Sequence, residues 1–206
     1  ILAVKPQVMG AVVADLARSL HSSSAVVSIA AGIQIADLQN WLGDSQAIVR
    51  AMPNTPAMVR HGATGLFANP LISSQQKESI QDIFNAVGIA CWVDSEVQID
   101  AVTAVSGSGP AYFFLVMEIM QKVAEEFGLP KQTARQLTLQ TALGAAQMAD
   151  TGSLDTTQLR KQVTSPGGTT HAAIETFIAG GLEESFRQAM QAAQNRAETM
   201  SKEFSS

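Results

Sequence analysis

The feature that most constrains the fold is a change of hydrophobic pattern close to residue 97. Up to about Val97, short apolar runs alternate with helical stretches, which is typical of an α/β layer arrangement. After Asp100 the strand signals stop, and long helical patterns continue to the end of the chain. We therefore predict an α/β domain over residues 1–96 and an all-helical domain over residues 97–206.

The expected elements follow from hydrophobic periodicity and from the Gly, Pro and Asn residues that interrupt it. In the first half, strands are expected over residues 1–4, 25–30, 47–51, 64–68 and 90–93, with helices over residues 7–21 and 74–87. In the second half, a long helix should begin at residues 108–110 and end at 128–130. Further helices are expected over residues 131–150, 156–163, 170–179 and 182–204.

Charge and cysteine usage exclude several classes of function. The net charge is -5 and the chain has no Lys/Arg run, so neither nucleic acid nor an anionic membrane is an expected partner. Apolar runs such as Ala111 to Met117 are short of the roughly 20 residues that cross a bilayer, so no span is expected. Cys91 is a single cysteine, and neither CxxC nor HExxH occurs, which predicts a cytoplasmic protein without a metal site.

The sequence raises two further expectations, one about the start of the chain and one about the surface of its helical half. Ile1 to Val4 has the pattern of a buried strand and the chain does not begin with Met, so we expect that an N-terminal piece is missing. The helical half is apolar enough to leave broad exposed stripes if it stood alone. We therefore predict a homodimer or larger homo-oligomer that forms through this half.

Residues 163–170, with the sequence VTSPGGTT, are the most informative candidate site. Adjacent glycines allow backbone N–H groups to turn inward, and the helix that follows adds partial positive charge at its N-terminus. This combination predicts a site for an anion such as a substrate carboxylate. The alternative is that Thr169 or Thr170 only caps a helix after a tight turn.

Three further segments follow predicted strands, where ligands of open α/β sheets bind. The first is Lys5-Pro6, the second is Ala30-Ala31-Gly32, and the third is the proline-flanked loop of residues 50–57, RAMPNTPA. Small residues allow a backbone to approach a dinucleotide closely, and two prolines hold the third loop rigid. These segments are candidates for cofactor or substrate contact, and the alternative for the proline loop is a rigid turn alone.

The motifs together resemble the pyrroline-5-carboxylate reductase family. The resemblance rests on AVKP at 3–6, SIAAG at 28–32, RAMPNTPA at 50–57, DAVTAVSGSGPAY at 100–112 and VTSPGGTT at 163–170, and it covers essentially the whole chain. It implies a Rossmann-like domain for NADPH or NADH, followed by an all-α dimerisation domain. It also implies reduction of 1-pyrroline-5-carboxylate to L-proline, the last step of proline biosynthesis. The family's glycine-rich turn before the first segment has no counterpart in residues 1–206, so this fragment alone is expected to bind cofactor poorly.

The resemblance also implies the roles of individual residues. Residues implied to contact the cofactor are Ala3, Val4, Lys5, Pro6, Ile29, Ala30, Ala31, Asn54 and Gln162. Residues implied to bind the substrate are Glu96, Ser165, Gly168, Thr169 and Thr170. We further hypothesise that the Thr170 hydroxyl hydrogen-bonds or relays a proton to the ring nitrogen during hydride transfer.

The sequence leaves two alternative functions open. A β-hydroxyacid dehydrogenase-like enzyme would share the layout but would use a catalytic lysine in the helical half, where Lys122 and Lys131 have no motif context. A non-catalytic assembly module would use the helical half only to dimerise. Saturable NAD(P)H binding would distinguish an enzyme from such a module.

Overall fold

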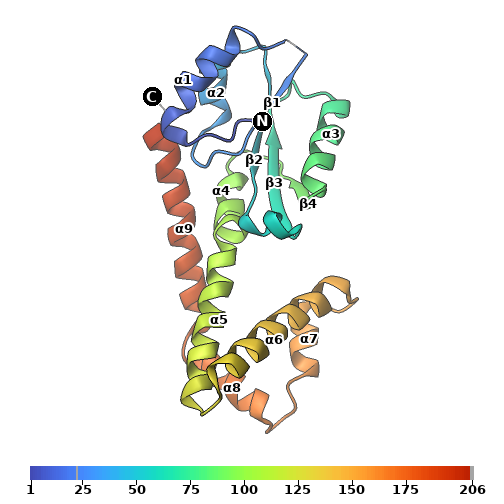
Figure 1. Cartoon of the computed structure of the whole chain (residues 1–206), viewed down its shortest axis with the longest axis vertical. Coiled ribbons are helices and arrows are strands. Elements are labelled where there is room, and N and C mark those ends of the chain that lie inside the picture. The colour runs from blue at the N-terminus through green and yellow to red at the C-terminus, as the bar shows by residue number, and fades with distance from the viewer. Residues whose placement is uncertain (22, 205–206) are drawn as a thin grey trace. The chain divides into compact units, whose positions relative to one another are not determined.

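The computed structural model describes residues 1–21 and 23–204. It divides into two compact units, each with its own internal contacts. The first, the sheet unit, contains Ile1–Pro110 and the C-terminal stretch that begins at Ala189; the second, the helical unit, is Ala111–Gln188 (Figure 1). The domain boundary between residues 96 and 97 stays a prediction.

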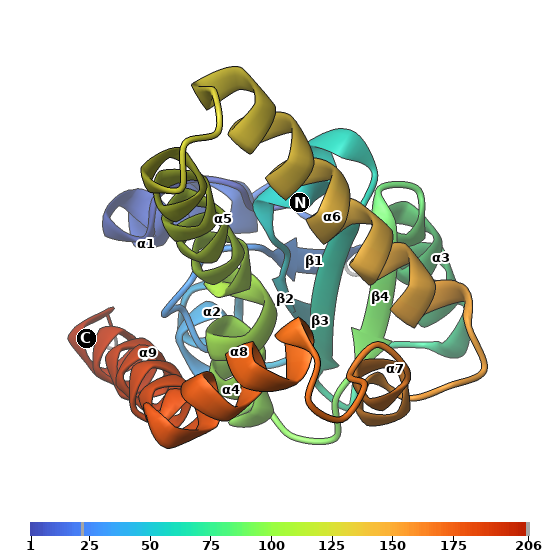
Figure 2. The ribbon, with the colours of Figure 1, turned by 90° about the horizontal axis from the view of Figure 1, so that it is seen from below.

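A four-stranded mixed sheet forms the centre of the sheet unit, in the order β1-β2-β3-β4 (Figure 2). The strands are β1 (Ala25–Ser28), β2 (Ala47–Met52), β3 (Gly62–Ala68) and β4 (Gly88–Trp92). β1 pairs with β2 and β3 with β4 in parallel, whereas β2 and β3 are antiparallel. The sheet therefore has two parallel pairs that run in opposite directions.

Two hydrophobic clusters cover the sheet, because alternate residues of a strand point to opposite faces. Val26 and Ile48 belong to the cluster that packs with α1 (Pro6–Ala17) and α2 (Ile35–Leu42). Val27 and Val49 belong to the cluster that packs with α3 (Ser74–Asn85). The side chain of Ser73 accepts a hydrogen bond from the Gln76 N–H in a capping box, which fixes where α3 begins.

A short helical run leads from the sheet toward the second unit. It consists of α4 (Gln98–Val102) and the π-helix η2 (Thr103–Gly107). α4 lies close to β3: a Cβ on Gly65 would be 2.6 Å from Val102 Cγ1, so only glycine fits at that position. A 3-10 helix, η1 (Thr55–Val59), joins β2 to β3.

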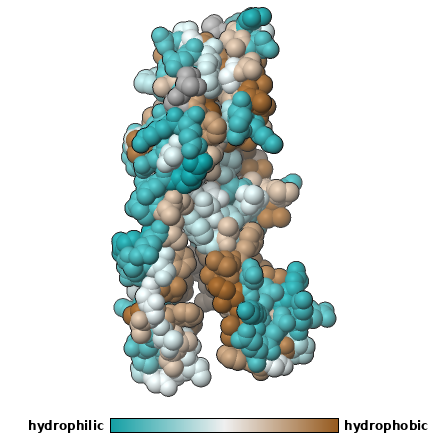
Figure 3. All heavy atoms as spheres, turned by 90° about the vertical axis from the view of Figure 1, so that its left-hand side faces the viewer, coloured by the Kyte–Doolittle hydropathy of each residue, from teal (hydrophilic) through white to brown (hydrophobic). Residues whose placement is uncertain are grey.

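The remaining helices are α5 (Gly109–Glu126), α6 (Lys131–Thr151), α7 (Thr156–Gln162), α8 (Thr169–Ala179) and α9 (Leu182–Phe204). Apolar side chains lie on the surface of the helical unit, where Phe113 is 68% exposed and Phe127 is 84% exposed (Figure 3). The expected exposed stripes are therefore present. α9 begins in the helical unit, and its last turns belong to the sheet unit.

One helical run is longer and more apolar than the sequence analysis expected. The helical run Gln98–Glu126 is long and apolar enough to cross a membrane by length and composition, and 11% of its most apolar window is buried. The uninterrupted apolar runs of the sequence are shorter, but isolated polar residues do not prevent the whole helical run from meeting this criterion. Length and composition alone are weak evidence for a membrane span, because an apolar helix that packs against a protein partner satisfies the same criterion.

The element boundaries differ from expectation mainly in the sheet unit. Residues 1–4 form only an isolated bridge, between Leu2 and Ser28, rather than a strand. The helix expected over residues 7–21 ends at Ala17. The helices α2 and α4 and the π-helix η2 were not predicted.

Candidate functional site

Three of the predicted segments lie at the same edge of the sheet. Residues 3–6 follow the bridge at Leu2, residues 29–31 follow β1, and Asn54 follows β2. The carboxyl ends of parallel strands meet at one edge, and the Ile29 N–H donates to the Leu2 carbonyl at 3.1 Å. The structure therefore brings together eight of the predicted cofactor residues: Ala3, Val4, Lys5, Pro6, Ile29, Ala30, Ala31 and Asn54.

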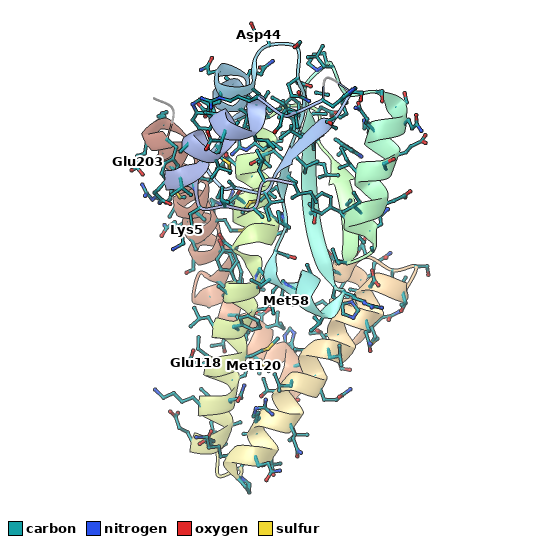
Figure 4. All side chains as sticks on the ribbon, turned by 45° about the horizontal axis from the view of Figure 1, so that its top comes forward. Lys5, Asp44, Met58, Glu118, Met120 and Glu203 are labelled. Atoms are coloured by element: carbon teal, nitrogen blue, oxygen red, sulfur yellow. The ribbon has the colours of Figure 1, made fainter. Side chains whose placement is uncertain are left out.

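The start of α1 has the chemistry of an anion-binding end. Pro6 occupies the first turn, no side chain caps the helix, and the first turn contains no acidic residue. Lys5 precedes it and is exposed (Figure 4). Uncapped N–H groups, the helix dipole and an ammonium group together favour a negative ligand, so this end fits part of a dinucleotide phosphate.

Asn54 holds the end of β2 against the π-helix. Its Nδ2 donates to the Ser106 carbonyl at 3.0 Å, and its Oδ1 accepts from the Ala63 N–H at 2.9 Å. Both ends of the amide are thus engaged within the sheet unit. The geometry gives Asn54 a structural role beside the cofactor contact implied for it.

A buried ion cluster surrounds Arg50, whose side chain is only 3% exposed. Its Nη1 lies 3.2 Å from Glu96 Oε1, and its Nη2 lies 3.5 Å from Asp100 Oδ1. Glu96 Oε1 also accepts the Ile35 N–H at 2.8 Å, at the first residue of α2. The cluster therefore connects β2, the segment before α4, and the start of α2.

The carboxyl of Asp100 lies in this cluster, 3.5 Å from the Arg50 guanidinium. Burial raises the pKa of its carboxyl above the ordinary value, while the Arg50 guanidinium lowers that pKa and the charge of Glu198 raises it further. The net direction is upward. Glu198 comes from the last turns of α9, so this helix also contributes to the electrostatics around Arg50.

The glycine turn lies in the helical unit, between α7 and α8. Gly167 has φ +72, and the Gly168 N–H donates to the Ser165 carbonyl at 3.0 Å, which closes the turn. Gly168 is the N-cap of α8, and no side chain caps that helix. Thr169 and Thr170 are exposed, so neither acts as the side-chain cap that was the alternative interpretation. The turn leaves uncapped amides and hydroxyls facing solvent.

Gln162 ends α7 and is exposed, a few residues before the turn. It belongs to the helical unit together with Ser165, Gly168, Thr169 and Thr170, whereas Glu96 and the other predicted cofactor residues belong to the sheet unit. The predicted site residues thus form two groups.

Sequence reasoning did not single out Arg50 and Asp100. A usable signal was present, because Arg50 interrupts the apolar run Ala-Ile-Val-Arg-Ala-Met of β2. A charge inside a buried strand requires an oppositely charged partner. Asp100 could have been proposed as that partner only with knowledge of α4.

Comparisons with known proteins decide the family. The sequence profile for pyrroline-5-carboxylate reductase dimerisation matches residues 96–200. The pyrroline-5-carboxylate reductase of Pseudomonas aeruginosa is 53% identical over 204 residues, which cover 99% of this chain and 75% of that protein. The chain belongs to the pyrroline-5-carboxylate reductase family.

Solved structures agree with this assignment. A pyrroline-5-carboxylate reductase from Coxiella burnetii is 50% identical with a TM-score of 0.93, and the alignment covers 97% of this chain and 74% of that one. The Plasmodium falciparum pyrroline carboxylate reductase with NADP bound is 32% identical, with a TM-score of 0.88 and coverage of 97% and 75%. The resemblance and the predicted fold class, a Rossmann-like domain followed by a helical domain, are confirmed. The dehydrogenase and assembly-module alternatives are not supported.

Proposed function

We propose that this protein reduces 1-pyrroline-5-carboxylate to L-proline by hydride transfer from NADPH or NADH, the last step of proline biosynthesis. The observation that carries the proposal is the 53% identity to a pyrroline-5-carboxylate reductase over 99% of the chain. A second support is the similarity to a relative whose structure holds NADP. The protein is accordingly an NAD(P)H-dependent oxidoreductase that acts on a C=N bond.

The cofactor site in this proposal lies at the carboxyl edge of β1 and β2. Bound NAD(P)H supplies the hydride. The uncapped start of α1, with Lys5 and Pro6, binds negative charge there, and Ala30 and Ala31 allow close approach of the backbone. The whole proposed set is Ala3, Val4, Lys5, Pro6, Ile29, Ala30, Ala31, Asn54 and Gln162.

The substrate site in this proposal is the glycine turn at the start of α8. Backbone N–H groups of Thr169 and Thr170 and the hydroxyl of Ser165 hold the carboxylate of the imine acid beside Gly168, whose own N–H closes the turn. Holding the carboxylate fixes the ring relative to the turn, and such orientation contributes up to about 7–11 kcal/mol in favourable cases. Glu96 is also proposed to bind the substrate, and both of its observed contacts use Oε1.

Thr170 is the proposed catalytic residue. Its hydroxyl makes no hydrogen bond among the residues that the structure describes, and it stands on the first turn of α8 beside the proposed carboxylate site. From there it donates a hydrogen bond or a proton to the ring nitrogen, which becomes an amine as the imine carbon accepts hydride. No strongly basic side chain is then required.

In this proposal the enzyme forms oligomers through its helical domain. Its profile describes dimerisation, and its exposed apolar residues, among them Phe113, Phe114 and Ile119, provide the surface that a second copy would bury. We propose a homodimer or larger homo-oligomer, without nucleic-acid or membrane partners, in the cytoplasm.

The test follows NAD(P)H absorbance with 1-pyrroline-5-carboxylate. The full-length protein should oxidise NADPH or NADH rapidly. Thr170→Ala should lower kcat about 100-fold, the lower range of general acid–base contributions, while Thr170→Ser should retain most of it. Unchanged turnover of Thr170→Ala would remove Thr170 from the mechanism, and no oxidation by the folded wild-type protein would contradict the function.

A further inference from the structure

Residues 29–35, which join β1 to α2, carry three of the proposed cofactor residues, Ile29, Ala30 and Ala31. We propose that Glu96, held by Arg50, and Phe204 on α9 are positioning residues for this cofactor-binding segment. This inference rests on the proposed function, because it assigns the segment to NAD(P)H. It adds the last helix of the chain to the determinants of cofactor affinity.

Glu96 anchors the far end of the segment. Its Oε1 accepts the N–H of Ile35 at 2.8 Å, a contact between residues 61 positions apart in the sequence. The same oxygen lies 3.2 Å from Nη1 of Arg50, whose side chain is 3% exposed and therefore cannot swing into solvent. A carboxylate at the N-terminus of a helix also interacts favourably with the helix dipole. Arg50 thus fixes Glu96, and Glu96 fixes the start of α2.

Phe204 covers the middle of the segment. Gly32 has φ +80, and a Cβ at that position would lie 2.9 Å from Phe204 Cδ2 and 3.3 Å from the Met200 carbonyl carbon. Phe204 also packs against the core cluster that contains Ile33. In the preceding turns of α9, Ala197 is 8% and Ser201 is 1% exposed, so this end of the helix is seated on the sheet unit.

The near end of the segment is anchored locally. The Ala30 N–H donates to Ser28 Oγ at 3.3 Å, and the Ile29 N–H donates to the Leu2 carbonyl. With Glu96 and Phe204 the segment is thus held at its start, middle and end. A binding segment that is held before the ligand arrives loses less conformational freedom on binding, which raises affinity without a new contact.

The expected consequence is a selective loss of cofactor affinity when an anchor is removed. If the binding-competent arrangement of the segment is less populated, the apparent Kd rises in proportion, while the complex, once formed, reacts as before. Glu96→Ala and Phe204→Ala should each raise the KM for NADPH about tenfold, the change expected for the loss of one interaction worth about 1.4 kcal/mol. In Phe204→Ala, the kcat at saturating NADPH and the KM for the imine acid should stay within about twofold.

The experiment uses the full-length protein and four comparison variants. Glu96→Gln keeps an oxygen that accepts the Ile35 N–H and should restore most of the affinity, as should Phe204→Leu, which keeps apolar volume. Asp94→Ala, an exposed acid two residues before Glu96, and Lys202→Ala, an exposed residue of the last turn of α9, should behave as wild type. Hydrogen exchange by mass spectrometry should show faster exchange over residues 29–37 in the two anchor variants only.

Each outcome is informative. An unchanged NADPH KM in both anchor variants overturns the inference, and so does a raised KM for the imine acid in Glu96→Ala with the NADPH KM unchanged, which would leave Glu96 with its proposed substrate role alone. If wild-type protein shows no turnover, the proposed function fails by itself. In that case, the affinity of each variant for NADPH can still be compared by measuring the quenching of NADPH fluorescence on binding. If Phe204→Ala does not fold, Phe204→Leu together with Glu96→Ala decides the outcome.

Discussion

The side-chain amide of Asn54 donates a hydrogen bond to the backbone carbonyl of Ser106 at 3.0 Å, which ties the end of β2 to the π-helix η2. The same amide accepts the Ala63 N–H at 2.9 Å. Asn54→Asp keeps an acceptor for Ala63 but replaces the donor to Ser106 by an oxygen. We expect the free energy of unfolding to fall by about 1–3 kcal/mol, as measured by urea denaturation.

Asn85→Asp is the matched control for this change. Asn85 also accepts a backbone N–H through Oδ1, that of Ala90 at 3.1 Å, but it donates no hydrogen bond among the described residues. It should therefore lose less stability than Asn54→Asp. Equal losses would show that the bond to Ser106 contributes nothing.

The raised pKa of Asp100 predicts how stability changes with pH. A carboxyl whose pKa is higher in the folded protein than in the unfolded chain favours folding fully below its ordinary pKa of 3.8, and this contribution is lost as pH rises through the folded value. Asp100→Asn stays neutral and can still accept from Arg50. The free energy of unfolding of Asp100→Asn should therefore not lose this contribution as pH rises. Urea denaturation from below pH 3.8 to neutral pH measures it. An Asp94→Asn control, at an exposed position, should retain the wild-type dependence; an unchanged dependence in Asp100→Asn would contradict the assignment.

The exposed apolar surface of α5 predicts a specific effect on assembly. Ile119 is 53% exposed in a single chain, and Ile119→Lys would place a charge in the proposed interface between copies. We expect the variant to shift from dimer, or larger assembly, toward monomer in light scattering coupled to gel filtration. Gln75→Lys on α3 adds the same charge to an exposed site in the sheet unit and should leave the assembly unchanged. A fully assembled Ile119→Lys protein would place the interface elsewhere.

Long periodic helices were predictable from the sequence to within a residue or two. The expected bounds of α9 agree with Leu182–Phe204, and α6 extends one residue beyond the expected Asp150. These helices carry many apolar residues at helical spacing, so the repeated pattern indicates a helix even where a single position is ambiguous. The exposed apolar surface was predictable for the same reason.

Short and context-dependent elements were not predictable. α2 has only eight residues, and although Asp37 accepts the Gln34 N–H in a local capping box, the carboxylate that accepts the Ile35 N–H comes from Glu96, 61 residues away. The antiparallel pairing of β2 with β3 and the π-helix at Thr103–Gly107 likewise depend on tertiary packing. The location of the candidate segments at one sheet edge was predictable, because each segment follows a predicted strand. The ion cluster around Arg50 and the packing of Phe204 were not predictable, because they depend on the three-dimensional structure.

Transfer of an isotopic label tests the central claim most directly. NADPH that carries deuterium at the reactive C4 position is incubated with 1-pyrroline-5-carboxylate and the full-length protein, and the product is analysed by mass spectrometry and NMR. Hydride transfer to the imine carbon predicts L-proline with one deuterium on the ring carbon that is bonded to nitrogen and does not bear the carboxylate. Proline without deuterium, or oxidation of NADPH without proline, would contradict the proposed reaction.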